Sequence, residues 1–390
     1  MNKTYDRWFL LITFFLLGLG ALMIYSSTAV VSPAMSKKDV TQFFYFKRHL
    51  FTMLLGFAAM FSAYRLRTET LNKTAVPLLI FSFLLLVLVF VPGMGISAGG
   101  AKRWLRLWPS TFQPSELVKL SMVIFLAKYM SAYNYRTDSF VSFAKPIAVM
   151  AVFQAIFLKQ PDFGAAISLG IITLAMLFFS GIRMRYLLSL TVFAIPVIVK
   201  LVQEPYRWKR VTSFLNPWED PQGSGFQLIQ SFIALGSGGI KGVGLGESKQ
   251  KLLFLPETHT DFIFSLVGEE LGLIGAGVII LLFVMLFVRG IAVTNKAKDS
   301  FVYYLSFGLS IMIALQALIN FSVVTGMIPT KGLPLPFISY GGSALLVNMA
   351  AVGILLNLSK GEDSRRVVDR TKELVMRKKA LRAVYGNKQF

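Results

Sequence analysis

A succession of long apolar runs constrains this chain more than any other feature of its sequence. The first run begins at Trp8 and the last ends at Leu358, and hydrophobic residues make up 55% of the whole chain. A helix of about 20 apolar residues spans the hydrocarbon layer of a bilayer. Helices are favoured there because they satisfy their backbone hydrogen-bonding groups within one segment. The sequence therefore predicts an all-α polytopic membrane protein.

About ten of these runs are long enough to be transmembrane helices, with ends accurate to a few residues. We expect them at residues 8–30, 49–64, 75–91, 115–130, 146–158, 164–180, 186–202, 262–288, 301–324 and 341–358. The polar segment 203–260, between the seventh and eighth helices, is predicted to be a long extracytoplasmic loop. In this interpretation residues 1–358 form one transmembrane domain, and residues 359–390 form a basic cytoplasmic tail.

The basic residues predict which side of the membrane carries the termini. An even number of crossings places both termini on one side, and short basic turns and the basic tail gather there. Lysine and arginine are enriched in cytoplasmic loops, so both termini are predicted to be cytoplasmic. The net charge of +21 is then typical of contact with anionic membrane lipids or with an anionic lipid substrate. It does not indicate nucleic-acid binding.

Cysteine and histidine limit the metal chemistry that this chain can perform. There is no cysteine, which excludes disulfides and thiolate metal sites. The only histidines, His49 and His259, lie far apart in the sequence. A histidine-built metal centre is therefore not expected, and the sequence assigns no metal ligands.

The long polar loop contains one glycine-rich segment. Residues 236–246 carry spaced glycines, but no strand precedes them, so we reject a dinucleotide-binding site. The residues just before them, 226–235, predict a short amphipathic helix that lies on the membrane surface.

The stretch 251–265 turns from this loop into an apolar helix and carries acids where the hydrocarbon begins. Glu257, His259 and Asp261 lie at the border. A carboxylate in such a place is costly to ionise, so it is capped, paired or used in chemistry. From the residues alone two interpretations stay open. Either Asp261 or Thr260 caps the following helix, or Asp261 has a chemical role.

A second polar stretch, 113–119, opens the fourth predicted helix. Pro114 suits the first helical position, and Glu116 and Lys119, three residues apart, lie on one face of the helix. They form either an internal ion pair or a lysine that its glutamate orients toward an anionic substrate. The preceding cationic, glycine-rich loop, 93–114, adds Arg103 near the same membrane face.

Two further polar stretches are predicted at this face. The KQPDFG turn carries Gln160 and Asp162, which are ordinary turn residues as well as possible ligands. The irregular stretch 330–343 carries Lys331 and Ser339 among prolines and glycines. Irregular backbone at membrane depth is tolerated where it is buried in protein or lines a wet cavity. Lys331 is therefore a structural residue of a re-entrant loop or a contact for an anion.

One acid and several cations at one face suit a lipid-pyrophosphate substrate. Cations stabilise a leaving pyrophosphate, and a carboxylate takes the proton of an attacking hydroxyl. The same residues also suit a transporter, in which an aspartate embedded in the membrane relays protons. The polar residues predicted inside the bundle, Gln316, Asn320 and Asn348, are few. This scarcity favours chemistry at a face over transport through the membrane.

Four motif blocks in this chain resemble those of a known family. QPSELVK, KQPDFGAA, FLPETHTDFIFSLVGEELG and PTKGLPLPFISYGGS are similar, in this order, to signature blocks of the SEDS proteins (shape, elongation, division and sporulation). The resemblance covers the whole membrane portion. KQPDFG and TKGLPLPFISYGGS are more similar to the division branch of the family, FtsW, than to the elongation branch, RodA.

The resemblance implies an activity, a location and partners. SEDS proteins are peptidoglycan glycosyltransferases that polymerise lipid II at the outer face of the cytoplasmic (inner) membrane, and the division branch acts in septal synthesis. The expected protein partners are a class B penicillin-binding protein, which is an FtsI-like transpeptidase, and other divisome membrane proteins. The expected ligands are lipid II, the nascent glycan strand and membrane lipids. A divalent cation, Mg²⁺ or Mn²⁺, is a candidate cofactor at the pyrophosphate.

The resemblance also implies roles for individual residues. The catalytic aspartate of the family falls on Asp261, as general base, and undecaprenyl pyrophosphate is the leaving group. Positions of the family motifs that bind substrate fall on Arg103, Glu116, Lys119 and Lys331. From the same polar stretches we add as substrate-binding candidates Glu257, His259, Gln160, Asp162 and Ser339.

Three alternatives to a division polymerase stay open. The chain could be a lipid II flippase, which is a transporter, or a non-catalytic scaffold of the divisome. It could also be a polymerase with an elongation-type role, like RodA.

Overall fold

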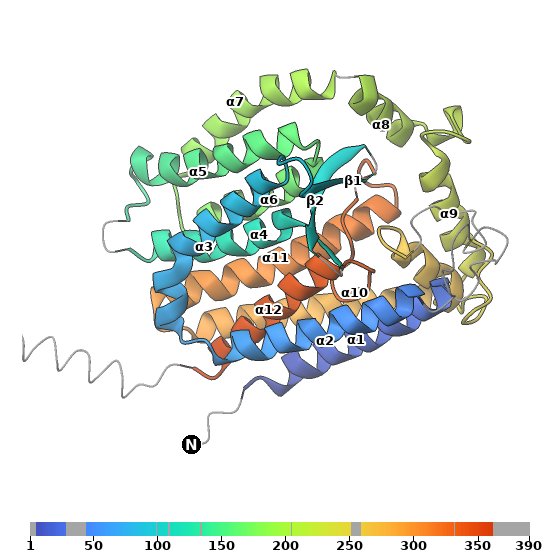
Figure 1. The fold of residues 1–390 in the computed structure, drawn as a ribbon, viewed down its shortest axis with the longest axis horizontal. Coiled ribbons are helices and arrows are strands. Elements are labelled where there is room, and N and C mark those ends of the chain that lie inside the picture. The colour runs from blue at the N-terminus through green and yellow to red at the C-terminus, as the bar shows by residue number, and fades with distance from the viewer. Residues whose placement is uncertain are drawn as a thin grey trace, which may run out of the picture.

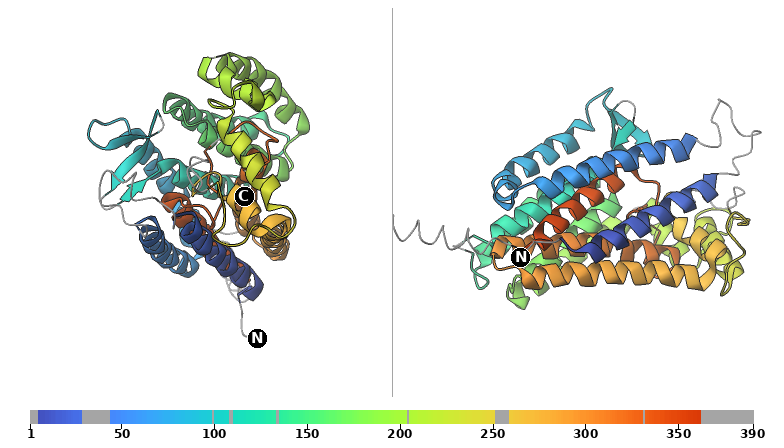
Figure 2. Two further views of the ribbon diagram at one scale, coloured as in Figure 1. Left: turned by 90° about the vertical axis from the view of Figure 1, so that its right-hand side faces the viewer. Right: turned by 90° about the horizontal axis from the view of Figure 1, so that it is seen from below.

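A computed structural model describes residues 5–28, 44–98, 100–107, 110–132, 135–203, 205–250, 259–330 and 332–361. Long helices run roughly side by side along the length of the molecule (Figures 1 and 2). Each of the ten predicted segments coincides with a helix. These are α1 (Arg7–Thr28), α2 (Phe44–Arg65), α3 (Thr68–Leu88), α4 (Pro114–Met130), α5 (Phe140–Lys159), α6 (Phe163–Phe179), α7 (Met184–Val202), α10 (Ile263–Lys296), α11 (Ser300–Val324) and α12 (Gly342–Ser359).

The fold confirms the prediction of an all-α polytopic membrane protein. Among the described residues, six helices are both long and apolar enough to cross a bilayer, namely α1, α3, α5, α10, α11 and α12. Helix α6 is equally apolar but has 17 residues, which is near the lower end of the range that spans hydrocarbon. The total of ten crossings therefore stays a prediction.

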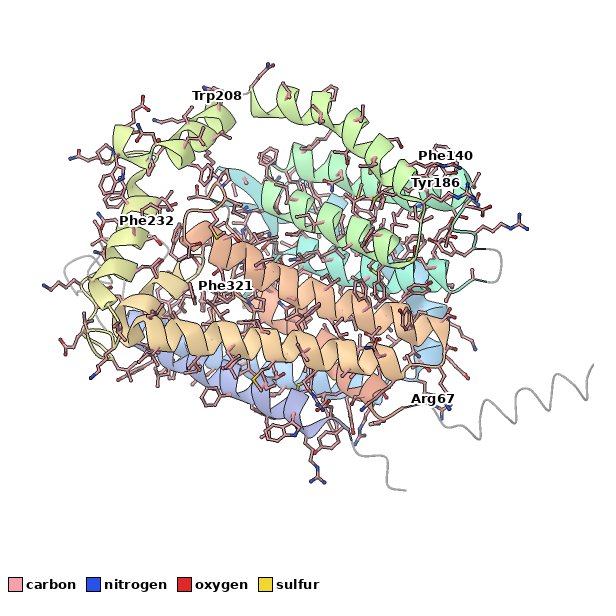
Figure 3. The ribbon with its side chains drawn as sticks, turned by 180° about the vertical axis from the view of Figure 1, so that it is seen from behind. Arg67, Phe140, Tyr186, Trp208, Phe232 and Phe321 are labelled. Atoms are coloured by element: carbon pink, nitrogen blue, oxygen red, sulfur yellow. The ribbon has the colours of Figure 1, made fainter. Side chains whose placement is uncertain are left out.

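The described ends of the chain meet at one end of the bundle. The backbone amide of Asp6, just before α1, donates to Ser359 Oγ at the end of α12 over 3.0 Å. Asp6 also accepts a hydrogen bond from Arg289 Nε on α10 at 2.9 Å. In Figure 3, Arg67 marks this end, and Phe232 lies at the opposite end. We call them the terminal end and the loop end. Which of them faces the cytoplasm stays a prediction.

Helices α4, α11 and α12 form the centre of the bundle. Each is buried around most of its circumference, as expected of a helix that is apolar on all sides. Helix α12 packs against α2, α11 packs against α10 and α4, and α3 also packs on α4. Helix α7 lies at the periphery (Figure 1) and exposes Leu188, Val192 and Ile195, as expected of a helix that faces lipid.

The predicted loop 93–114 contains a small sheet that sequence analysis missed. Strands β1 (Gly95–Ala98), β2 (Ala101–Leu107) and β3 (Ser110–Phe112) form an antiparallel sheet in the order β1-β2-β3. On β2, Ala101 and Leu105 are buried and Lys102 and Arg103 are half-buried. The pairing of β1 with β2 shifts register between Ile96 and Ser97, so the side chains do not alternate regularly along β2. Strand β2 contacts helix α4 of the bundle.

The segment 203–260 folds into short helices at the loop end. It contains α8 (Pro205–Leu215), a 3₁₀ turn (Pro217–Glu219) and α9 (Phe226–Gly238). Helix α9 coincides with the predicted amphipathic helix. It packs on α10 and buries Leu228, Ile229 and Ala234. Its apolar face therefore meets protein.

Helix α10 is broken at Gly272, where φ is +68°. A break leaves amides and carbonyls without partners inside the helix, which is costly at membrane depth. The glycine-rich segment 238–246 supplies these partners. Four main-chain hydrogen bonds join it to the two sides of the break: Val243 N to Glu269 O (3.0 Å), Gly244 N to Glu270 O (3.1 Å), Leu273 N to Gly239 O (2.9 Å) and Ile274 N to Ile240 O (3.2 Å). The spaced glycines thus have a structural role.

We expect Gly242→Ala to destabilise the protein. Gly242 has a φ of +83°, and a Cβ atom there would lie 2.2 Å from the backbone oxygen of Glu270. Both the strain and the clash with backbone lower the free energy of unfolding, by at least about 1 kcal/mol. The midpoint of thermal unfolding in detergent, followed by tryptophan fluorescence, should fall. Gly236→Ala is the control, because a Cβ atom there meets no heavy atom within 4 Å. Equal midpoints for the two variants would contradict this prediction.

Candidate active site

Asp261 lies at the loop end, directly before α10. The N-cap of α10 is Phe262, which makes no side-chain capping hydrogen bond, so Asp261 is one residue too early to be the N-cap. The Asp261 side chain is half-buried. A Cβ atom at position 332 would lie 2.8 Å from Asp261 Oδ2. The carboxylate therefore lies against the glycine that follows Lys331 in the sequence.

A buried asparagine fixes the backbone of Asp261. Asn320, on α11, is 1% exposed, and its Nδ2 donates to the backbone oxygens of Asp261 at 2.9 Å and of Leu333 at 2.8 Å. One side chain thus joins the loop before α10 to the loop before α12. These two hydrogen bonds hold both irregular loops to α11, close to the contact between the Asp261 carboxylate and Gly332.

Other polar side chains hold the loop before α12 in the same way. Gln316 Nε2, on α11, donates to Pro334 O at 3.2 Å. Its Oε1 accepts from Asn348 Nδ2 on α12 at 3.3 Å. Ser339 is buried, and its Oγ accepts from the backbone amide of Leu335 at 2.7 Å. Ser339 therefore stabilises the turn in which it lies, and its predicted contact with substrate stays a prediction.

His259 and two tyrosines at the same end pack against one another. The imidazole centroid lies 5.1 Å from the ring of Tyr45, on α2, and 5.7 Å from the ring of Tyr340. The backbone amide of Tyr340 donates to His259 O at 2.8 Å. Burial raises the pKa of the Tyr340 phenol, which keeps its proton at neutral pH. This aromatic group joins α2 to both loops beside Asp261.

Asp162 joins three elements. It is the N-cap of α6, and its Oδ1 accepts from Ala165 N at 3.1 Å. Its Oδ2 accepts from Gln113 Nε2 at 3.1 Å and Ser115 Oγ at 3.4 Å, both at the start of α4. Arg103 on β2 approaches Asp162 Oδ1 to 3.8 Å. Asp162 is buried, so the geometry gives it a structural role that the turn residues of KQPDFG had already suggested.

Glu116 and Lys119 form the internal ion pair that their spacing allows. Lys119 Nζ lies 2.9 Å from Glu116 Oε1, and the side chains are 2% and 4% exposed. Neither Lys119 Nζ nor Glu116 Oε2 has a partner in hydrogen-bonding geometry among the described residues. Gln160 donates its Nε2 to Leu86 O at 2.9 Å, and its Oε1 has no such partner in that part of the chain either. Lys119 therefore has donors left for an additional acceptor.

The four polar stretches converge on one region. The backbone amide of Gln113 donates to Ser343 Oγ at 2.8 Å, which joins the first block to the last. A Cβ atom at Gly164 would lie 3.3 Å from the side chain of Leu333, which joins the KQPDFG turn to the same loop. Gly332, next to Leu333, meets Asp261. The predicted convergence of the motifs at one membrane face is thus a property of the fold.

Two of the predicted site residues, Glu257 and Lys331, lie outside the described residues. A protein-built metal centre is not evident in the described ranges, where no three acidic or histidine side chains are grouped as metal ligands. A Mg²⁺ ion is usually held by one or two carboxylates together with substrate phosphates. A divalent cation of this kind would therefore need few ligands from the protein.

Comparison with known proteins shows to which family this chain belongs. Residues 7–364 match the sequence model of the FtsW/RodA/SpoVE family, described as "Cell cycle protein". The chain belongs to this family. A protein of Geobacter metallireducens named "Probable peptidoglycan glycosyltransferase FtsW" is 46% identical over 359 residues, which is 92% of this chain and 95% of that relative. The stage V sporulation protein E of Bacillus subtilis is 43% identical over 358 residues, 91% of this chain and 97% of that relative.

Solved structures of the FtsW/RodA/SpoVE family share the fold. A chain from a peptidoglycan synthase complex, described for its coordination of polymerization and crosslinking, has a TM-score of 0.75 and 28% identity, covering 92% of this chain and 99% of that one. The rod shape determining protein RodA of Thermus thermophilus has a TM-score of 0.67 and 26% identity, covering 92% of this chain and 98% of that one. The polytopic helical fold of this chain is therefore shared with RodA and with the chain of that synthase complex.

Two residues that hold Asp261 in place are not predicted from the sequence. Asn320 stands there only as one of a few interior polar residues, and nothing marks Gly332. A lone asparagine in an apolar helix is costly unless it is hydrogen-bonded. That cost was the available signal that Asn320 has a partner, although its identity required the fold.

We expect Gly332→Ala to reduce activity with little loss of stability. The added methyl group would meet Asp261 Oδ2, and the end of a flexible side chain moves away more easily than backbone does. A displacement of a reacting group by about 1 Å lowers a rate by as much as about 100-fold. The rate of glycan polymerisation and the thermal midpoint should be measured on the same preparation.

The control for Gly332→Ala is Gly18→Ala, because no heavy atom lies within 4 Å of a Cβ atom at position 18. We expect this variant to polymerise normally. An unchanged rate for Gly332→Ala would mean that the carboxylate of Asp261 does not need its present position.

Proposed function

We propose that this chain is a peptidoglycan glycosyltransferase that polymerises lipid II into glycan strands at the outer face of the cytoplasmic membrane during cell division. Relatives named for this activity are similar over more than nine tenths of the chain. The observation that carries the proposal is the position of Asp261. Its carboxylate lies half-buried at the loop end of α10, and Asn320 and Gly332 hold it where the motif blocks meet.

In the proposed reaction, Asp261 acts as general base. It takes the proton of the 4-hydroxyl of the acceptor GlcNAc as that oxygen attacks the anomeric carbon of the terminal MurNAc on the growing strand. The bond from that carbon to the pyrophosphate oxygen breaks, and undecaprenyl pyrophosphate leaves. Pyrophosphate is a good leaving group, so the second carboxylic acid that glycosidases use to protonate a leaving sugar is not needed.

Cations at the loop end would stabilise the charge of the departing pyrophosphate. We assign this role to Lys119, Arg103 and Lys331. Lys119 keeps donors free beside Glu116, and Arg103 is 27% exposed with a buried, unpaired Nε. A divalent cation, Mg²⁺ or Mn²⁺, would be held mainly by the pyrophosphate and would add positive charge there.

The rigid frame around Asp261 supports chemistry at this place. A general base is effective when it is already positioned before the substrate binds, because less ordering is needed in the transition state. Asn320, Gln316 and Asn348 provide that frame through hydrogen bonds to both loops or to each other.

The same contacts weaken the flippase alternative. A flippase needs polar groups free to meet a polar headgroup along a route through the bundle. The amides of Gln316, Asn320 and Asn348, which would line such a route, instead donate to backbone and side-chain oxygens near the loop end. A polymerase active at one face is therefore favoured over a transporter.

A partner is part of the proposal. The structural relative in the peptidoglycan synthase complex is described for polymerization together with crosslinking. By analogy, we propose that this chain pairs with a class B penicillin-binding protein of the FtsI type, among other divisome membrane proteins at the septum. In the orientation that we propose, both termini are cytoplasmic and the loop end faces the outer side of the cytoplasmic membrane.

A polymerisation assay separates the candidate functions. Purified protein in detergent should be incubated with lipid II, with and without the transpeptidase, and the products resolved by size on a gel. Detergent removes any membrane to flip across, so the appearance of glycan polymer supports a polymerase. If lipid II stays monomeric even with the transpeptidase present, the polymerase hypothesis is wrong, and the transporter and scaffold hypotheses remain.

A further inference from the structure

A basic cavity lies at the terminal end, at the far end of α10 from Asp261. It has a volume of about 230 Å³ and is formed by the end of α10, the beginning of α11 and the end of α12. Three lysines line it, together with apolar side chains. The main lining residues are Lys296, Lys298, Lys360, Val293, Val302 and Leu358.

The described acids next to this cavity are already bound to other groups. Within the described part of the chain, no ion pair involves Lys296 or Lys298. Asp299 is the N-cap of α11, and its carboxylate accepts from the amides of Phe301 at 2.6 Å and Val302 at 3.3 Å. Asp6 is paired with Arg289. Among the residues that the structure describes, the positive charge of the cavity therefore stays largely uncompensated.

Lys360 differs from the other two lysines. Its ammonium group lies 3.5 Å from the ring centroid of Tyr64, on α2. Such a cation–π contact orients the lysine but leaves its donors able to bind an anion on the other side. The contact also joins α2 to the cavity, so a ligand held by the three lysines would connect the ends of four helices.

We infer that this cavity binds the phosphate group of an anionic phospholipid. Basic pockets between transmembrane helices, at the membrane surface, bind lipid headgroups. The lining supports a lipid over a free anion, because Val293, Val302 and Leu358 are buried apolar residues directly beneath the lysines. Lysines at a helix end also extend toward the interface while their carbon chains stay in the apolar layer. This site lies apart from the proposed active site and does not depend on it.

The binding would stabilise the protein. A ligand that binds only the folded state raises the free energy of unfolding in proportion to the logarithm of its concentration. At about 100 times the dissociation constant we expect the thermal midpoint to rise by roughly 3 °C. Because the contact is partly electrostatic, the rise should shrink at high salt.

The test compares thermal midpoints of the full-length protein in detergent with added lipids. Phosphatidylglycerol should raise the midpoint, and phosphatidylcholine with the same acyl chains should not. In the variant Lys296→Gln/Lys298→Gln most of the rise should be lost. The control, Lys73→Gln/Lys145→Gln, has the same change of charge on two exposed lysines outside the cavity, and it should keep the rise. The full-length chain is used, so that residues 362–390 are present in the wild type and in every variant.

Two results would overturn this proposal. Equal loss of the rise in both double variants would mean that general attraction between the lipid and a basic protein explains it. A rise of the same size with inorganic phosphate would assign the cavity to a free anion. Native mass spectrometry gives an independent measure, in which the Lys296→Gln/Lys298→Gln variant should retain fewer phosphatidylglycerol molecules than wild type and the control should retain the same number.

Discussion

Asp261→Asn should abolish polymerisation while the protein stays folded and inserted. Asparagine has almost the same shape as aspartate, so the backbone bond from Asn320 and the contact with Gly332 are preserved. The amide cannot accept the proton of the attacking hydroxyl. Removal of a general base lowers a rate by about 100-fold to 10,000-fold, and we expect a loss in this range in the initial rate of glycan polymer formation.

The matched control for Asp261→Asn is Asp138→Asn. Asp138 is an exposed acid, 57% accessible, whose side chain lies 3.8 Å from Arg183, and its replacement should leave the rate unchanged. The thermal midpoint of Asp261→Asn should lie close to that of wild type. A normal rate of polymerisation by Asp261→Asn would remove this carboxylate from the mechanism.

Lys119→Met should strongly destabilise the protein, because it leaves the carboxylate of Glu116 buried without its cation. Glu116 is 3% exposed, and removal of one partner of a buried pair lowers the free energy of unfolding by roughly 3–5 kcal/mol. The double variant Glu116→Gln/Lys119→Met removes both charges and should recover most of this loss. The measurement is chemical or thermal unfolding in one detergent.

The same double variant separates a structural lysine from one that binds substrate. If Lys119 contacts the pyrophosphate, the double variant should be stable and should still need more lipid II than wild type for half-maximal rate. Recovery of both stability and the wild-type lipid II requirement would show that the ion pair has only a structural role. The single variant Glu116→Gln is a further comparison, because it removes the acid of the ion pair but keeps Lys119 as a possible contact for substrate.

Local features of the fold could be predicted from the sequence because their causes lie within a few residues. Apolar runs predict helices in a bilayer, since each helix satisfies its own backbone. The spacing of Glu116 and Lys119 predicts that they lie on one helix face, and the ion pair between them follows. The motif at Asp162 predicts a turn and a helix cap, which the structure contains.

Long-range contacts could not be predicted in this way. Nothing near Asn320 in the sequence indicates that its amide bonds Asp261 and Leu333, which are 59 and 13 residues away. The role of the glycine-rich segment as the partner of the broken α10 depends on how two separate segments pack. The sheet in 93–114 was missed because its strands are short and a register shift interrupts their alternation.

By itself the sequence determined the class of protein, the helix positions and the motif blocks, because hydrophobicity and local spacing are written in neighbouring residues. The tertiary structure alone decided which polar groups meet. Asp261, Gly332 and Asn320 come together only when α10, α11 and the loop before α12 pack side by side. In an apolar layer each of these polar groups must find a partner, and the packing of the helices determines which partner is within reach.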